Sequence, residues 1–219
     1  MKKTSNIEAI DLFCGAGGLT KGLEKSGIKV KVGVDVDPAC EYPYAVNNSG
    51  DFILKSVTDL KGSDLQGYYN KPAIKLLAGC APCQTFSTYN QKATEEDDRW
   101  WLLLEFARIV KEMKPELVTM ENVPGLEDQE VFQEFITGLK EKGYSVSTQI
   151  VDCSSYGLPQ QRRRLVLLAS KYGSIELLKP SQFGRKKKSV RDVIGKQPAI
   201  NCGEVPEKDR LHQSSRLND

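Results

Sequence analysis

A cysteine near residue 80 has the surroundings of a nucleophile. Cys83 lies between Pro82 and Gln84 and follows the apolar run 74–78, which is typical of a buried strand. Open α/β sheets place their ligand crevice at the carboxyl ends of the strands, so we expect Cys83 to border such a crevice. A thiolate there could act as a covalent nucleophile.

Two other interpretations of this cysteine stay open at this point. Free cysteine is often a small buried hydrophobe, although Gln84, Thr85 and Ser87 make plain core packing less favourable. Cys80 and Cys83 also have the spacing of a redox or metal-binding pair. A second such pair for zinc is missing from the sequence, and the single histidine lies far along the chain.

Two further chemical groups flank predicted strands. Glu121 follows the apolar run 116–120, and the segment 160–164, with Arg162 and Arg164, precedes the apolar run 165–169. Each alone has an ordinary alternative, a helix cap or ion pair for Glu121 and a surface charge for Arg164.

A glycine turn follows the first predicted strand, residues 7–13. It spans residues 14–18 and leads into a predicted helix at 19–26; a second strand at 30–34 ends on Asp35. Glycine turns let a ligand approach backbone N–H groups, and an acid about 20 residues later can accept hydrogen bonds from ribose. The nicotinamide fingerprint needs a glycine where this chain has Thr20. A helix cap is the alternative for Asp35.

The remaining pattern predicts an α/β fold with a mostly parallel sheet and helices on both faces. The other expected strands lie at 52–54, 74–78, 116–120, 144–151 and 165–169, and the other expected helices at 100–113, 131–142 and 189–194.

Composition is that of a soluble globular protein: 219 residues, 39% hydrophobic and 27% charged. Neither a membrane-spanning run nor a signal peptide is visible, and the six irregularly spaced cysteines indicate reduced thiols. We therefore expect a cytoplasmic protein. Net charge is +2, but residues 160–219 hold 14 Lys/Arg against 6 Asp/Glu. This basic end predicts phosphate contact, with a solvated surface run as the alternative.

Several of these blocks together resemble one family. Pro82-Cys83-Gln84 followed by Phe86-Ser87 is similar to the catalytic loop of the cytosine-5 DNA methyltransferases. The further matching blocks occur in the family's order: the glycine turn, the acid at Asp35, Glu121-Asn122-Val123, and the pattern of Gln160, Arg162 and Arg164. The resemblance extends over about residues 7–219.

The resemblance implies a Rossmann-like core that transfers a methyl group from S-adenosylmethionine to carbon 5 of cytosine, in a restriction-modification or phage setting. It makes Cys83 the covalent nucleophile, Glu121 the group at ring nitrogen 3, and Arg164 with Arg162 the holders of the carbonyl oxygen. The base is flipped out of double-stranded DNA, which Gln84, Ser87, Gln160 and Arg162 would contact.

The resemblance also implies a cofactor site without a metal. Its residues would be Phe13, Cys14, Gly15, Ala16, Gly17, Gly18, Asp35, Val36, Pro82 and Leu102. Many relatives carry an acid for adenine where this chain has Ser56; Asp59 is a possible substitute.

The family's carboxyl-terminal motifs do not appear in this sequence. We expect residues 1–178 to form the cofactor-binding and catalytic domain and residues 179–219 a basic linker. A second subunit carrying the target-recognition domain and the remaining motifs is the favoured explanation, and a longer chain the other. A non-catalytic DNA-binding remnant and a tRNA cytosine-5 methyltransferase are the alternative functions.

Overall fold

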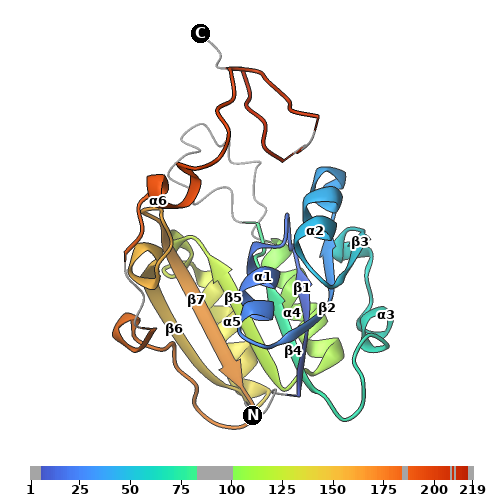
Figure 1. Ribbon diagram of the computed structural model, residues 1–219. Coiled ribbons are helices and arrows are strands. Elements are labelled where there is room, and N and C mark those ends of the chain that lie inside the picture. The colour runs from blue at the N-terminus through green and yellow to red at the C-terminus, as the bar shows by residue number, and fades with distance from the viewer. Residues whose placement is uncertain (1–5, 83–100, 184–186, 208, 210, 217–219) are drawn as a thin grey trace.

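The computed structural model describes residues 6–82, 101–183, 187–207, 209 and 211–216. Its centre is a sheet in the order β3-β2-β1-β4-β5-β7-β6 (Figure 1). The strands are β1 (Ile7–Leu12), β2 (Lys29–Asp35), β3 (Asp51–Leu54), β4 (Ile74–Gly79), β5 (Leu117–Asn122), β6 (Ser145–Asp152) and β7 (Arg163–Ser170). The α-helices are α1 (Gly18–Lys25), α2 (Glu41–Asn47), α3 (Gly62–Gln66), α4 (Trp101–Met113), α5 (Glu130–Glu141) and α6 (Val190–Ile194).

Strands β3, β2, β1, β4 and β5 run parallel, whereas β7 is antiparallel to both β5 and β6. The amino end of β7 therefore lies at the same edge as the carboxyl ends of β1, β4 and β5. In the register, Glu121 on β5 pairs with Val166 on β7, two residues from Arg164. The antiparallel strand thus brings residues that precede it to the edge where the parallel strands end.

Helices cover both faces of the sheet, as the sequence predicts. One face packs on α4 and α5 through a large apolar core that includes Phe106, Phe132 and Leu139. The other face carries α1 and α2, which lie in front of the sheet in Figure 1. There Leu23 of α1 packs on a small cluster of Ala9, Val30 and Leu76.

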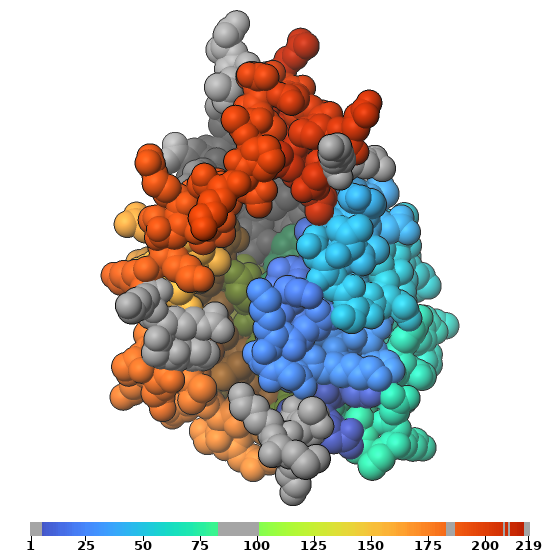
Figure 2. Space-filling model, viewed as in Figure 1, coloured from blue at the N-terminus to red at the C-terminus, as the bar shows by residue number. Residues whose placement is uncertain are grey.

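The α1 face is incompletely covered. Leu117, Thr119 and Glu121 of β5 and Val166 and Leu168 of β7 point to this side and are all half-buried. Within the described residues, no helix covers this part of the sheet. Figure 2 shows the surface hollowed between α1 and the segments after β6.

The predicted strands are all present, with ends shifted by at most two residues. The helices predicted at 19–26, 131–142 and 189–194 form as α1, α5 and α6 with shifts of one residue, and α4 is described from Trp101. Helix α3, which is 5 residues long, was not expected from the sequence. The described residues contain no helix long and apolar enough to cross a bilayer.

Candidate active site and cofactor cleft

The glycine turn after β1 has a left-handed backbone at several positions. Phe13, Gly15 and Gly17 have φ values of 57°, 53° and 86°. The Gly17 N–H donates to the Cys14 carbonyl at 2.9 Å, which closes the turn before α1 begins. The glycines are needed because side chains rarely adopt this conformation.

Asp35 holds this turn in place from the end of β2. Its Oδ2 accepts the Gly15 N–H at 2.7 Å, and its Oδ1 accepts the Asp37 N–H at 3.0 Å. The cap of the next helical turn is Asp37, whose Oδ1 accepts the Ala39 N–H at 2.9 Å. The cap interpretation of Asp35 is therefore wrong, because the cap is Asp37. Asp35 instead joins the glycine turn to the turn that begins at Asp37.

The surroundings of the turn suit a ligand with an apolar ring and ribose hydroxyls. A Cβ added to Gly15 or Gly18 would meet no described atom within 4 Å, so space adjoins both. Val36 is 67% exposed directly after Asp35, so its apolar side chain is open to contact with a ligand. Ser56 instead caps a short 3-10 turn by accepting the Thr58 N–H at 3.3 Å, and Asp59 is exposed nearby.

Gly17 departs from the expected role of a glycine that leaves room for the ligand. A Cβ there would overlap the side chain of Asn48 and lie 2.9 Å from Cδ2 of Tyr44. Tyr44 is fully buried on α2 and also packs against Gly33. The space beside Gly17 is therefore filled by the protein itself.

Asp11 lies fully buried behind the turn. Its Oδ2 accepts the Thr20 hydroxyl at 2.7 Å, while Oδ1 has no hydrogen-bond partner within the described part of the chain. Burial raises the pKa of Asp11 to about 6. Two hydrogen bonds from Thr20 partly offset this rise, and the negative charge of Asp35 adds to it. Asp11 was not among the site residues expected from the sequence, although a charged residue within an apolar strand pattern is a visible signal.

Glu121 and Arg164 meet at the open end of the sheet. Arg164 Nε lies 2.6 Å from Glu121 Oε1, with the side chains 16% and 31% exposed. The Arg164 Nη1 also donates to the Arg163 carbonyl at 2.7 Å, so the guanidinium is held on two sides. A partly buried pair of this kind can present both a carboxyl group and a cation to one ligand.

The end of β4 is tied to the end of β5 beside this pair. The buried Asn122 side chain donates from Nδ2 to the Ala81 carbonyl at 3.0 Å, next to Pro82. Gly79 of β4 pairs with Met120 of β5. The next residues, Cys80 and Glu121, therefore lie side by side on the same face of the sheet. Burial raises the pKa of the Cys80 thiol, and the charge of Glu121 raises it further.

The structure thus brings Glu121, Arg164 and Pro82 together near the turn formed by Phe13, Cys14, Gly15, Ala16, Gly17 and Gly18. Burial, with the charges of Asp11 and Asp35, raises the pKa of the Cys14 thiol.

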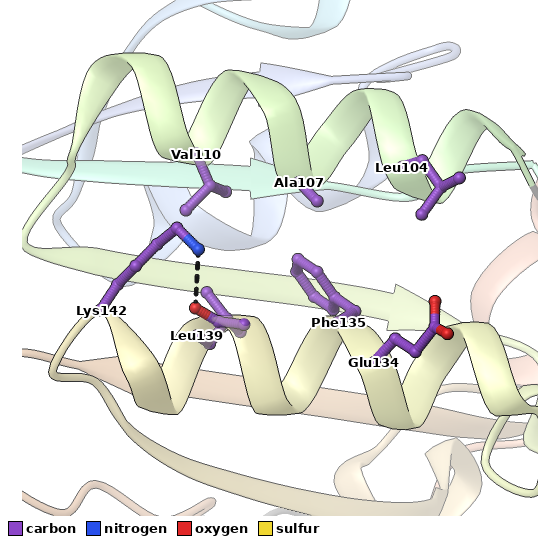
Figure 3. A pocket seen from close by; sticks show the side chains of 8 residues that line it. Leu104, Ala107, Val110, Glu134, Phe135, Leu139 and Lys142 are labelled. Carbon is purple, nitrogen blue, oxygen red and sulfur yellow. Dashed lines mark hydrogen bonds between the residues drawn. The ribbon is translucent and has the colours of Figure 1, made fainter.

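Gln160 and Arg162 are exposed on the connection before β7, and Leu102 is half-buried at the start of α4. The predicted Cys83, Gln84 and Ser87 lie outside the described residues. An apolar groove between α4 and α5 (Figure 3), lined by Leu104, Ala107, Val110, Phe135 and Leu139, is on the other side of the sheet from Glu121.

Comparison with known proteins shows the family of this chain. Residues 7–218 match the family described as C-5 cytosine-specific DNA methylase. The chain belongs to this family. The match begins at β1 and extends through α6, so it includes the glycine turn, Glu121 and Arg164.

Curated members of the DNA methylase family align along most of the chain. It is 45% identical to the type II methylase M.HgiDII of Herpetosiphon aurantiacus over 213 residues, which are 96% of this chain and 60% of that protein. It is 29% identical to the type II methyltransferase M.AquIA of Picosynechococcus over 203 residues, or 86% of this chain and 82% of that protein. Against several other methylases the chain spans about half of their length.

Solved structures share the methylase fold. A prophage-encoded protein of E. coli, described as a DNA modification methyltransferase, superposes with a TM-score of 0.73 at 26% identity, covering 90% of this chain and 57% of that one. The S. pombe Dnmt2 methyltransferase superposes with a TM-score of 0.63 at 20% identity, covering 93% and 56%, and shows the common fold. The Rossmann-like architecture expected from the sequence is confirmed.

Proposed function

We propose that this chain is the catalytic part of a DNA cytosine-5 methyltransferase that uses S-adenosylmethionine. The observation that carries the proposal is the Glu121–Arg164 pair beside the end of β4, in a member of the C-5 cytosine-specific DNA methylase family. A carboxyl group and a guanidinium held side by side suit the ring nitrogen 3 and the carbonyl oxygen 2 of cytosine, which are neighbouring atoms.

Cys83 supplies the nucleophile in this proposal. Its thiolate forms a bond to carbon 6, the ring electrons move towards nitrogen 3, and nitrogen 3 takes a proton that the Glu121 carboxyl group has first taken up from solvent. Arg164, supported by Arg162, stabilises negative charge on the carbonyl oxygen. Carbon 5 then takes the methyl group, which leaves S-adenosylhomocysteine as the second product, and the nitrogen 3 proton returns to Glu121. A base removes the carbon 5 proton as the thiolate leaves carbon 6.

The cofactor supplies an activated methyl group when bound. In the proposal, the backbone from Phe13 to Gly18 holds its methionine part and Asp35 its ribose, with adenine packed against the exposed Val36. Pro82 and Leu102 complete the cleft. Asp35 can serve in this way because each carboxylate oxygen that accepts a backbone N–H still has a lone pair for a hydroxyl.

The DNA must present the cytosine outside its stack, because carbon 6 is out of reach within a duplex. Gln84, Ser87, Gln160 and Arg162 contact the strand around the flipped base in this proposal. The basic residues after position 160 add phosphate contacts. Action on cellular DNA places the protein in the cytoplasm.

The proposal includes a partner segment that completes the core. The half-buried face formed by β5 and β7 on the α1 side is where a further helix would add cover. We propose that a second polypeptide carries it, together with the target-recognition domain, and that residues 179–219 lead towards it.

The experiment is methyl transfer from labelled S-adenosylmethionine to DNA and to tRNA, by the chain alone and with the remaining family motifs supplied. We expect label in carbon 5 of DNA cytosine, and only with the complement present. Label in tRNA alone would favour the tRNA methyltransferase, and DNA binding without any transfer would favour a non-catalytic protein.

A further inference from the structure

We propose that Cys80 is a positioning residue for Glu121, holding its carboxylate on the side away from Arg164 through a thiol hydrogen bond. The inference rests on the proposed function, because it assigns a role within the same site. It is carried by the register of β4 and β5 and by the contacts at the ends of these two strands.

The register fixes which side chains meet. Gly79 pairs with Met120 in parallel strands, so the next residues, Cys80 and Glu121, are neighbours that point to the same face. The Cys80 N–H donates to the Leu12 carbonyl at 3.2 Å, which anchors its backbone to β1 on the other side. The backbone of Cys80 is thereby fixed to β1, with Glu121 on its other side.

The thiol is suited to donate rather than to attack. The register places its sulfur beside the Glu121 carboxylate on the neighbouring strand, where the thiol can donate to a carboxylate oxygen. Burial first, and then the charges of Glu121 and Asp11, raise the pKa of the Cys80 thiol. A thiol that keeps its proton is a poor nucleophile but remains a donor to a carboxylate.

Cys80 and Arg164 come from opposite neighbours of β5. Arg164 reaches Glu121 from β7 at 2.6 Å, whereas Cys80 reaches it from β4. Two donors from two sides restrict the rotation of a carboxyl group that is 31% exposed. A carboxyl group aimed at nitrogen 3 of a flipped base gains from such restriction, because catalysis depends on its geometry in the transition state.

The first test is spectroscopic and needs only this chain. The S–H stretching band of Cys80, assigned by difference against Cys80→Ala, should move to higher frequency in Glu121→Gln, because an amide oxygen is a weaker acceptor than a carboxylate. The band should stay in place in Asp35→Asn. An unmoved band in Glu121→Gln would overturn the contact.

The second test is kinetic and uses the chain complemented for methyl transfer. Cys80→Ala should lower kcat about tenfold, the equivalent of one hydrogen bond, with KM for DNA and the Kd of S-adenosylmethionine unchanged. Cys80→Ser keeps a donor and should recover most of this loss, and Cys202→Ser, an exposed thiol in the tail, is the control. Wild-type kcat in Cys80→Ala, or a Cys80→Ser variant no better than Cys80→Ala, would overturn the positioning role. A wild-type protein without any methyl transfer would count against the proposed function, and the S–H band would still decide the contact.

Discussion

Arg164 Nε and Glu121 Oε1 are joined at 2.6 Å across the antiparallel strands β7 and β5. Glu121 is half-buried and Arg164 more deeply so, and the guanidinium also donates to its own strand's backbone. The pair is thus held by contacts within the chain itself.

We expect Arg164→Lys to lower kcat about a hundredfold, because an ammonium group cannot reproduce two fixed donor directions. Single-turnover methyl transfer with the complemented protein measures this. Arg163→Lys, an exposed neighbour on the same strand, is the matched control and should retain the wild-type rate. Equal rates for Arg164→Lys and wild type would remove the arginine from the mechanism.

Cys83→Ala should abolish methyl transfer and leave S-adenosylmethionine binding measurable, since the cofactor turn belongs to β1. DNA with 5-fluorocytosine at the target should become covalently attached to Cys83, because fluorine cannot leave as a proton does. Peptide mapping identifies the attached cysteine. Attachment at Cys80 would contradict both the nucleophile assignment and the protonated state of that thiol.

Gly17→Val should destabilise the fold more than Gly15→Ala. Both glycines have positive φ, which costs a side chain about 1 kcal/mol, but only at Gly17 would the new Cβ overlap Asn48 and Tyr44. We expect a loss of about 2–4 kcal/mol in the free energy of unfolding for Gly17→Val and about 1 kcal/mol for Gly15→Ala. Urea denaturation with matched m-values measures both. Equal losses would show that the contacts with α2 do not matter.

Asp11 should give the protein a specific pH dependence. Its pKa is raised from 3.8 to about 6, so the folded state binds the proton more tightly than the unfolded state. The contribution of Asp11 to the free energy of unfolding is fully present below about pH 4. It is lost as the pH rises to about 6 and does not return at higher pH. The total loss is about 3 kcal/mol. Asp11→Asn should remove this part of the dependence. Unfolding free energies at pH 4.5 and 7.5 for both proteins test it, and parallel pH profiles would count against a raised pKa of Asp11.

Asn122→Ala should loosen the turn that carries Pro82. The change leaves the Ala81 carbonyl without its buried donor, at a cost of about 1–3 kcal/mol in stability. Gln133→Ala is a matched control, because it removes a 2.8 Å bond from an exposed amide to the Glu127 carbonyl. Thermal denaturation should show a clear shift for Asn122→Ala and almost none for the control. Similar shifts would mean that burial of the amide contributes little.

The strands, the glycine turn and the acids at strand ends could be predicted because each depends on a local pattern. The contacts that organise the site could not. Asn122 reaches Ala81 across 41 positions, and Arg164 reaches Glu121 only because β7 runs antiparallel to β5. Gly17 was expected to make room for the ligand, but Tyr44 comes from α2, a helix without a strong periodic signal. Burial of Cys80 against Glu121 likewise depends on strand register.

The direction of β7 has a consequence for how such a chain tolerates rearrangement. Since Arg164 stands at the beginning of that strand, the polypeptide has already delivered both members of the pair when it leaves the sheet at Ser170. A new terminus or a large insertion after this point would not interrupt a contact between Glu121 and Arg164. Circular permutation or gene fission there should therefore preserve this ion pair, whereas the same cut between β5 and β7 would leave its two halves to find each other by diffusion.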